Sequence, residues 1–171
     1  MDRETEREVW RRVNRPGGLP AEQALLPDRL ERMILEQRMN AIQLRDLAGR
    51  LPAQERRIFF RMSSENDNRA RELTTLHYLI TGRSLRLKLP SQPAVGDLTE
   101  ALREAFFRQK QSAAGFEALA QEFSGYADQF SRLADQAQRH SNRIRQALQA
   151  HLERPPHGPT RPGGRQNQRN P

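Results

Sequence analysis

Four stretches of the chain carry apolar residues at alternating three- and four-residue spacing, the pattern of a helix with one buried face. They run from about residue 27 to 49, 53 to 81, 97 to 123 and 126 to 152. Apolar residues make up only 35% of the chain and charged residues 29%, a balance typical of amphipathic helices with wide polar faces. The spacing therefore predicts an all-α protein, an antiparallel four-helix bundle.

Local signals mark the expected helix ends. Pro52 is suited to the start of the second helix, and Gly82 to its C-cap. Asp97, with Glu100 three residues later, marks the start of the third helix. Residues 82–96 form the longest connection in the bundle. The alternating residues 85–89 could form a short strand, but no other segment could pair with them, so we expect an extended crossover between two helical hairpins.

The two ends of the chain differ from the middle in composition. Residues 1–19 mix charges with Trp10 and end in a Gly-Pro-rich joint, so we interpret them as an arm. Residues 20–153 form the expected bundle. Residues 154–171 contain no acid and no aliphatic residue, which predicts a disordered basic tail. The basic residues of this tail are Arg154, Arg161, Arg165 and Arg169.

Cysteine is absent, which excludes disulfides and thiolate metal sites. No apolar run approaches the roughly 18 residues of a membrane span, and the charged N-terminus does not resemble a signal peptide. These features favour a cytoplasmic protein without a membrane span.

The two expected hairpins repeat each other in sequence. A constant offset of 72 aligns their first helices, pairing Ala41 with Ala113, and an offset of 71 aligns their second helices, pairing Leu73 with Ile144. Any two amphipathic helices can be slid into register, but agreement in both helices with a one-residue slip favours a true internal repeat.

Polar residues interrupt the apolar stripe near the middle of each helix. They are Gln37, Asn66, Arg69, Gln109 and His140. Because an unpaired buried polar group costs roughly 1–3 kcal/mol, a polar layer at matching depth in four helices needs an explanation.

The spacing around this layer resembles the rubrerythrin-like branch of the ferritin-like superfamily over residues 26–152. That family has a Glu seven residues before an aromatic and ten before a Leu-Ala pair, then Glu-x-x-His, and repeats the set. Here the spacing is Gln37, Leu44 and 47–48, and again Gln109, Phe116 and 119–120. The resemblance implies a ferritin-like bundle.

The metal ligands of that family are replaced at most of the aligned positions. Gln37 and Gln109 stand in place of Glu, Asn66-x-x-Arg69 replaces the first Glu-x-x-His, and Ala137-x-x-His140 replaces the second. We therefore expect no metal and no cofactor, and a non-catalytic bundle that binds a protein partner or associates with itself. The Arg69 guanidinium is expected to fill the metal space, held by the Gln37 and Gln109 amides, Asn66 and His140, or else to turn toward Glu36 or Glu65.

Two alternatives remain open from the sequence. Glu36, Glu65 and Asp135 lie one or two residues from the aligned positions and could form a shifted metal site in a divergent metalloprotein that handles iron or peroxide. One residue is about 100° of helix rotation, so we expect these acids to point outward into a solvated ring. The arginine tail could instead bind nucleic acid through phosphate contacts.

Overall fold

The computed structural model describes residues 25–91 and 96–154, and within them the chain is all-α, without a strand. The all-α prediction is confirmed. The elements are α3 (Leu26–Arg50), α4 (Ala53–Thr81), α5 (Leu98–Glu122), the 3₁₀ turn η1 (Ser124–Tyr126) and α6 (Ala127–Glu153).

The helix ends follow from local chemistry. The Asp97 side chain accepts a hydrogen bond from the backbone N–H of Glu100 at 2.8 Å, so it caps α5 as the sequence predicts. Gly82 ends α4 with φ +67°, a left-handed conformation that glycine adopts without a steric penalty. Pro52 lies at the N-cap of α4, and its missing N–H costs the helix nothing there.

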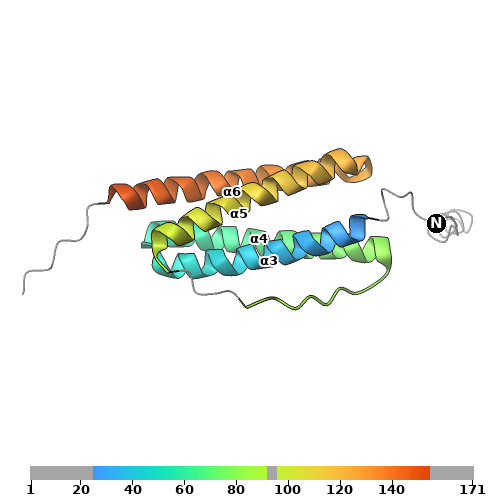
Figure 1. The fold of residues 1–171 in the computed structure, drawn as a ribbon, viewed down its shortest axis with the longest axis horizontal. Helices are drawn as coiled ribbons and strands as arrows, with labels where there is room; N and C mark the ends of the chain where they lie inside the picture. Colours follow the sequence, from blue (N-terminus) through green and yellow to red (C-terminus); the bar gives the residue numbers. More distant parts are fainter. Residues whose placement is uncertain (1–24, 92–95, 155–171) are drawn as a thin grey trace, which may run out of the picture.

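The four helices lie side by side, with α3 and α4 below α5 and α6 in Figure 1. Helix α3 packs along α4, and α5 packs along α6. Between these two pairs, the backbones of α3 and α5 approach closely, whereas those of α4 and α6 lie farther apart and are joined through side chains. The seam between α4 and α6 is therefore the more open of the two.

Two apolar clusters occupy the two ends of the interior, as the spacing of the stripes requires. One cluster includes Leu30, Ile34, Leu73, Phe116, Phe130 and Leu133. The other includes Leu44, Leu47, Phe59, Met62, Leu102 and Ile144. Leu152, which the stripe of the fourth helix includes, is instead 58% exposed. The end of α6 projects past the other helices in Figure 1, so no other described helix covers it.

The connection after α4 contains no strand over residues 83–91 and runs back beneath the helices in Figure 1. Leu85 and Leu87 are partly buried and pack on the first apolar cluster. The expected arm (residues 1–19) and the tail beyond Arg154 lie outside the described residues. No helix in the described part of the chain has the length and apolar character to cross a membrane.

Candidate functional site at the centre of the four helices

The six positions that the resemblance assigns to metal ligands are all buried, and none is more than 2% exposed. These positions are Gln37, Asn66, Arg69, Gln109, Ala137 and His140. On each helix the apolar residues before and after them belong to different apolar clusters. We call this buried set, with its polar neighbours Asn40, Glu65 and Ser112, the central layer.

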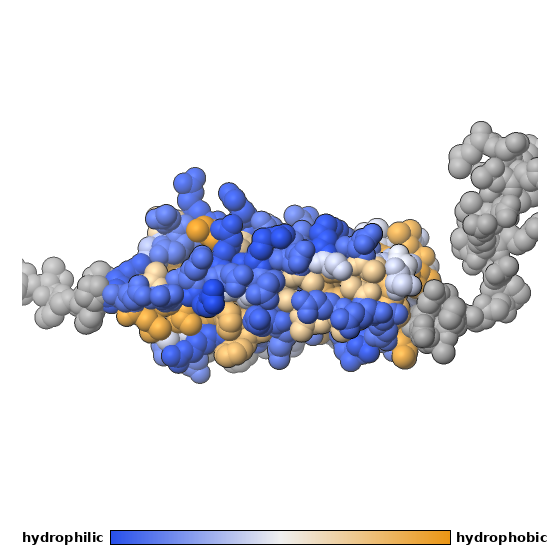
Figure 2. Space-filling view, turned by 90° about the horizontal axis from the view of Figure 1, so that it is seen from above, coloured by the Kyte–Doolittle hydropathy of each residue, from blue (hydrophilic) through white to orange (hydrophobic). Residues whose placement is uncertain are grey.

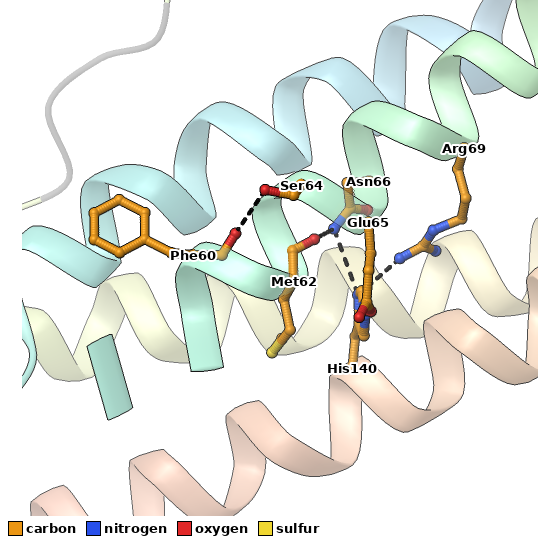
Figure 3. Close-up of polar contacts among 7 residues, drawn as sticks. All are labelled: Phe60, Met62, Ser64, Glu65, Asn66, Arg69 and His140. Carbon is orange, nitrogen blue, oxygen red and sulfur yellow. Dashed lines mark hydrogen bonds and ion pairs between the residues drawn. The ribbon is translucent and has the colours of Figure 1, made fainter. Parts of the chain in front are cut away.

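Arg69, His140 and Glu65 form a hydrogen-bonded chain across α4 and α6 (Figure 3). The Nη2 of Arg69 donates to the Nδ1 of His140 at 2.7 Å. Because a guanidinium only donates, Nδ1 must carry a lone pair, and the ring proton of neutral His140 lies on Nε2. This Nε2–H donates to the Oε2 of Glu65 at 2.5 Å. Both ring nitrogens of His140 are therefore engaged.

The electrostatics of the chain agree with this tautomer. Burial and the neighbouring Arg69 guanidinium lower the pKa of His140 to about 4, against the opposing effect of Glu65. Burial likewise lowers the pKa of Arg69 to about 10. At neutral pH, Arg69 is thus a buried cation and His140 a neutral imidazole.

Asn66 is turned back onto its own helix. Its Nδ2 donates to the backbone carbonyl of Met62 at 2.8 Å and also lies 3.4 Å from the Nδ1 of His140 (Figure 3). A short amide that bonds the preceding turn is a common way to satisfy a polar side chain within a helix. Asn66 therefore lines the Arg69–His140 contact without a carboxylate's charge.

The α3–α5 side of the central layer contains a neutral network. The Ser112 hydroxyl accepts hydrogen bonds from the Nε2 of Gln37 and the Nδ2 of Asn40, both at 3.1 Å. Beside it, the Ser63 hydroxyl donates to the carbonyl of Ala41 at 2.8 Å and ties α4 to α3. None of these side chains carries a charge.

The expectation that Arg69 is held by the two glutamine amides is wrong. Arg69 is buried, at 1% exposure, and contacts His140, but its Nε and Nη1 have no partner among the described residues. The Oε1 atoms of Gln37 and Gln109 and the Oδ1 of Asn66 are also unpaired there. The atom of Gln37 that would accept from a guanidinium is Oε1, and it makes no bond to Arg69, while Nε2 donates to Ser112. Buried unpaired groups make the central layer costly for the fold.

The acids of the shifted register take two different positions. Glu36 and Asp135 are exposed, as the rotation argument predicts. The side chain of Glu65 is also 45% exposed, yet its carboxylate reaches back to His140, so it does not belong to a purely solvated ring. Among the described residues, no group of three or more His, Cys, Asp or Glu side chains is placed to hold a metal ion.

The donor set of the central layer does not fit a pair of iron ions. Such sites use four carboxylates and two imidazoles. At the aligned positions this chain offers amides, a methyl group and a guanidinium, and its single imidazole has both nitrogens engaged. A cation would also be repelled by Arg69.

Sequence reasoning missed two members of the central layer, Asn40 and Ser112. Their hydrogen bond joins positions 72 residues apart, the offset that relates the first helices of the repeat. The Arg69–His140 bond joins positions 71 residues apart, the offset of the second helices. Both contacts thus join residues that the expected repeat pairs with each other.

Of the four tail arginines, only Arg154 lies within the described residues. Its guanidinium is 3.4 Å from a carboxylate oxygen of Glu55, so it is paired. Comparisons of the chain with protein-family models, with curated proteins and with solved structures gave no match in any of the three. The basis for a function is thus the chemistry of the central layer.

Proposed function

We propose that this chain is a non-catalytic, ferritin-like protein: an antiparallel four-helix bundle of two hairpins joined by a crossover, whose task is to bind a partner protein or a second copy of itself. The observation that supports this proposal is the chain from Arg69 through His140 to Glu65. In this series of hydrogen bonds, Arg69 is a cation and both ring nitrogens of His140 are engaged. A di-iron enzyme needs carboxylate oxygens and free imidazole nitrogens at the aligned positions.

The two-hairpin repeat is supported by contacts between equivalent positions. In a bundle with approximate two-fold symmetry, residues close to the axis meet their own counterparts. Asn40 bonds Ser112, and Arg69 bonds His140, which are pairs of counterparts under the offsets of 72 and 71. These two contacts support a two-fold bundle, although most of the family's metal ligands are replaced in this chain.

A binding role is supported by the apolar side chains left on the surface. Phe60 is 44% exposed and Phe107 is 63% exposed, and aromatic side chains are enriched at the cores of protein interfaces. The face seen in Figure 2 is largely hydrophilic, with apolar atoms gathered mainly toward the two ends. Other large exposed apolar residues are Leu25, Ile42, Tyr78, Leu79, Leu89 and Leu152.

Metal analysis of the full chain tests the proposal, with a restored variant as the positive control. The native chain, titrated with ferrous iron or Co²⁺, is expected to bind neither stoichiometrically. A variant with the family's ligands is expected to bind two ions per chain and to gain thermal stability on binding. Its substitutions are Gln37→Glu, Asn66→Glu, Arg69→His, Gln109→Glu and Ala137→Glu.

Two results would contradict the proposal in different ways. Two metal ions per native chain would refute the non-catalytic assignment. A restored variant that folds but shows no metal-dependent gain in melting temperature would refute the ferritin-like alignment. Light scattering on the native sample then separates self-association, seen as a multiple of the chain mass, from binding to another protein.

A further inference from the structure

A pocket of about 210 Å³ opens at the seam between α4 and α6. The backbones of these two helices lie farther apart than those of α3 and α5, which leaves room for the pocket between their side chains. The polar residues that line it are Arg61 and Glu65 from α4 and Gln136, Arg139, His140 and Arg143 from α6. The pocket therefore lies directly outside the Arg69–His140–Glu65 chain.

Three arginines in this pocket have no acidic partner among the described residues. Elsewhere on the four helices, several arginines that do not line this pocket, such as Arg71 and Arg145, also lack a carboxylate partner among the described residues, but four others are paired with carboxylates. Arg61, Arg139 and Arg143 are not, although all three line one pocket. The only acid in the lining, Glu65, already accepts the Nε2–H of His140. With neutral His140, three positive charges face one negative charge, so the lining carries a net charge of +2.

The placement of the arginines suits an anion held from two sides. Arg139 and Arg143 are four residues apart and lie on one face of α6, and Arg61 reaches in from α4. Guanidinium groups donate in a planar fork that matches the oxygens of a phosphate, and such charge-assisted bonds are the stronger ones. Two walls can therefore donate to different oxygens of one tetrahedral anion.

The positive field of this pocket reaches the buried groups behind it. Arg143 lowers the pKa of His140, after the larger effects of burial and Arg69, and Arg139 lowers the pKa of Arg69, after burial. A bound anion would offset this accumulation of positive charge. The pocket and the central layer are thus electrostatically coupled.

The size of the pocket limits its ligand. A site needs only about 10–15 Å³ of such space to hold one water, so the pocket has room for several waters or one small ion. A phosphate ion or the end group of a small phosphomonoester fits this space, whereas the rest of a nucleotide would extend out of it.

We propose that the α4–α6 pocket binds a phosphate-class dianion, free or as the end group of a small phosphomonoester, through Arg61, Arg139 and Arg143. This site is separate from the proposed function, because its ligand is an anion and the three arginines that would bind it are not among the positions aligned with metal ligands.

Calorimetric titration of the full chain with inorganic phosphate and with glycerol phosphate, against chloride, tests the site. We expect saturable binding of one dianion per chain. Arg139→Gln and Arg143→Gln should each weaken binding about tenfold, because each removes charge-assisted hydrogen bonds. Arg145→Gln is the matched control, since it removes the same charge from an exposed position of α6 outside the pocket. It should change the affinity less than about twofold.

Glu65→Gln should raise the affinity for phosphate, whereas the arginine variants lower it. The amide can still accept from His140 but removes the only negative charge in the lining, so the affinity for phosphate should rise severalfold. Tighter binding of glycerol phosphate than of inorganic phosphate would identify a phosphomonoester as the ligand, and equal binding a free ion.

Three outcomes would overturn the proposal. These are no saturable binding by either probe, equal losses for Arg143→Gln and the Arg145→Gln control, or a loss of oligonucleotide binding in the arginine variants without phosphate binding. Unchanged helical circular dichroism in each variant confirms that a lost affinity is not lost folding.

Discussion

The two sides of the central layer fill equivalent space with different chemistry. Between α4 and α6, a buried guanidinium, an imidazole and a carboxylate form a charged chain. Between α3 and α5, two amides share one hydroxyl and no charge is present. The offsets of 72 and 71 pair α3 with α5 and α4 with α6, so neither side is a copy of the other, and the two sides differ both in residue type and in packing.

Packing explains which side carries the charges. Helices α3 and α5 pack closely, and a Cβ at Gly115 would lie only 3.2 Å from the Sδ of Met33, so glycine permits this approach. On the other side, the backbones of α4 and α6 lie farther apart, and the side chain of Glu65 remains 45% exposed. Buried charges are costly unless they are paired and partly solvated. The charged residues therefore lie between α4 and α6, where the carboxylate of Glu65 reaches solvent.

The largest effect should come from breaking the charged side at its centre. His140→Leu removes the acceptor of Arg69 and leaves a buried guanidinium without a partner, since its other two nitrogens are already unpaired. Breaking one member of a buried charged network costs about 3–5 kcal/mol. Urea denaturation, with the native chain as reference, measures this loss of unfolding free energy.

Two companion variants separate lost charge pairing from lost volume. His140→Gln keeps an acceptor for Arg69 and a donor for Glu65, so it should cost much less than His140→Leu. The double variant Arg69→Met with His140→Leu removes the orphaned charge and should recover most of the loss. If the double variant is as unstable as His140→Leu alone, the cost comes from packing and not from the charge.

The second-largest effect should be a loss of stability at low pH, because His140 becomes protonated. The pKa of His140 is lowered from 6.5 to about 4 in the folded chain, so between these values the unfolded state binds a proton that the folded state does not. Stability should therefore fall as the pH drops from 6.5 to 4, by about 3 kcal/mol at most, and this contribution should be constant above 6.5.

The His140 contribution is isolated by a difference measurement. Denaturation at several pH values, compared between the native chain and His140→Gln, removes the titration of every other group. A difference that stays flat from pH 7 to pH 4 would contradict the neutral, buried imidazole. An NMR titration of the ring reports the same pKa directly.

The helices were predictable from sequence because their signals are local. Apolar spacing set the buried faces, and Pro52, Gly82 and Asp97 set ends that agree with the structure within one residue. The burial of Arg69 and His140 also followed from their place on the stripes. Polar residues that interrupt an apolar stripe can thus be predicted as buried before any coordinates are known.

The partners within the central layer were not predictable in the same way. Glu65 lies one residue before Asn66 and was expected to point outward, but its flexible side chain brings the carboxylate back to His140. Ser112 lies between amides of α3 and has no distinctive sequence context. The direction in which the Glu65 side chain extends and the distance between α4 and α6 depend on how the helices pack. Neither can be predicted from the spacing of apolar residues.

The neutral side should respond less strongly, and without pH dependence. Ser112→Ala removes the acceptor shared by Gln37 and Asn40 and leaves two buried amide donors unpaired, at a cost of about 2 kcal/mol. Ser64→Ala is the matched control, because this exposed hydroxyl only bonds the carbonyl of Phe60 four residues earlier, and its loss should cost less than about 0.5 kcal/mol. The Ser112→Ala loss, measured by urea denaturation, should be the same at pH 4 and pH 7. A loss that grows toward low pH would mean that the two sides of the layer are coupled through Arg69 and are not chemically separate.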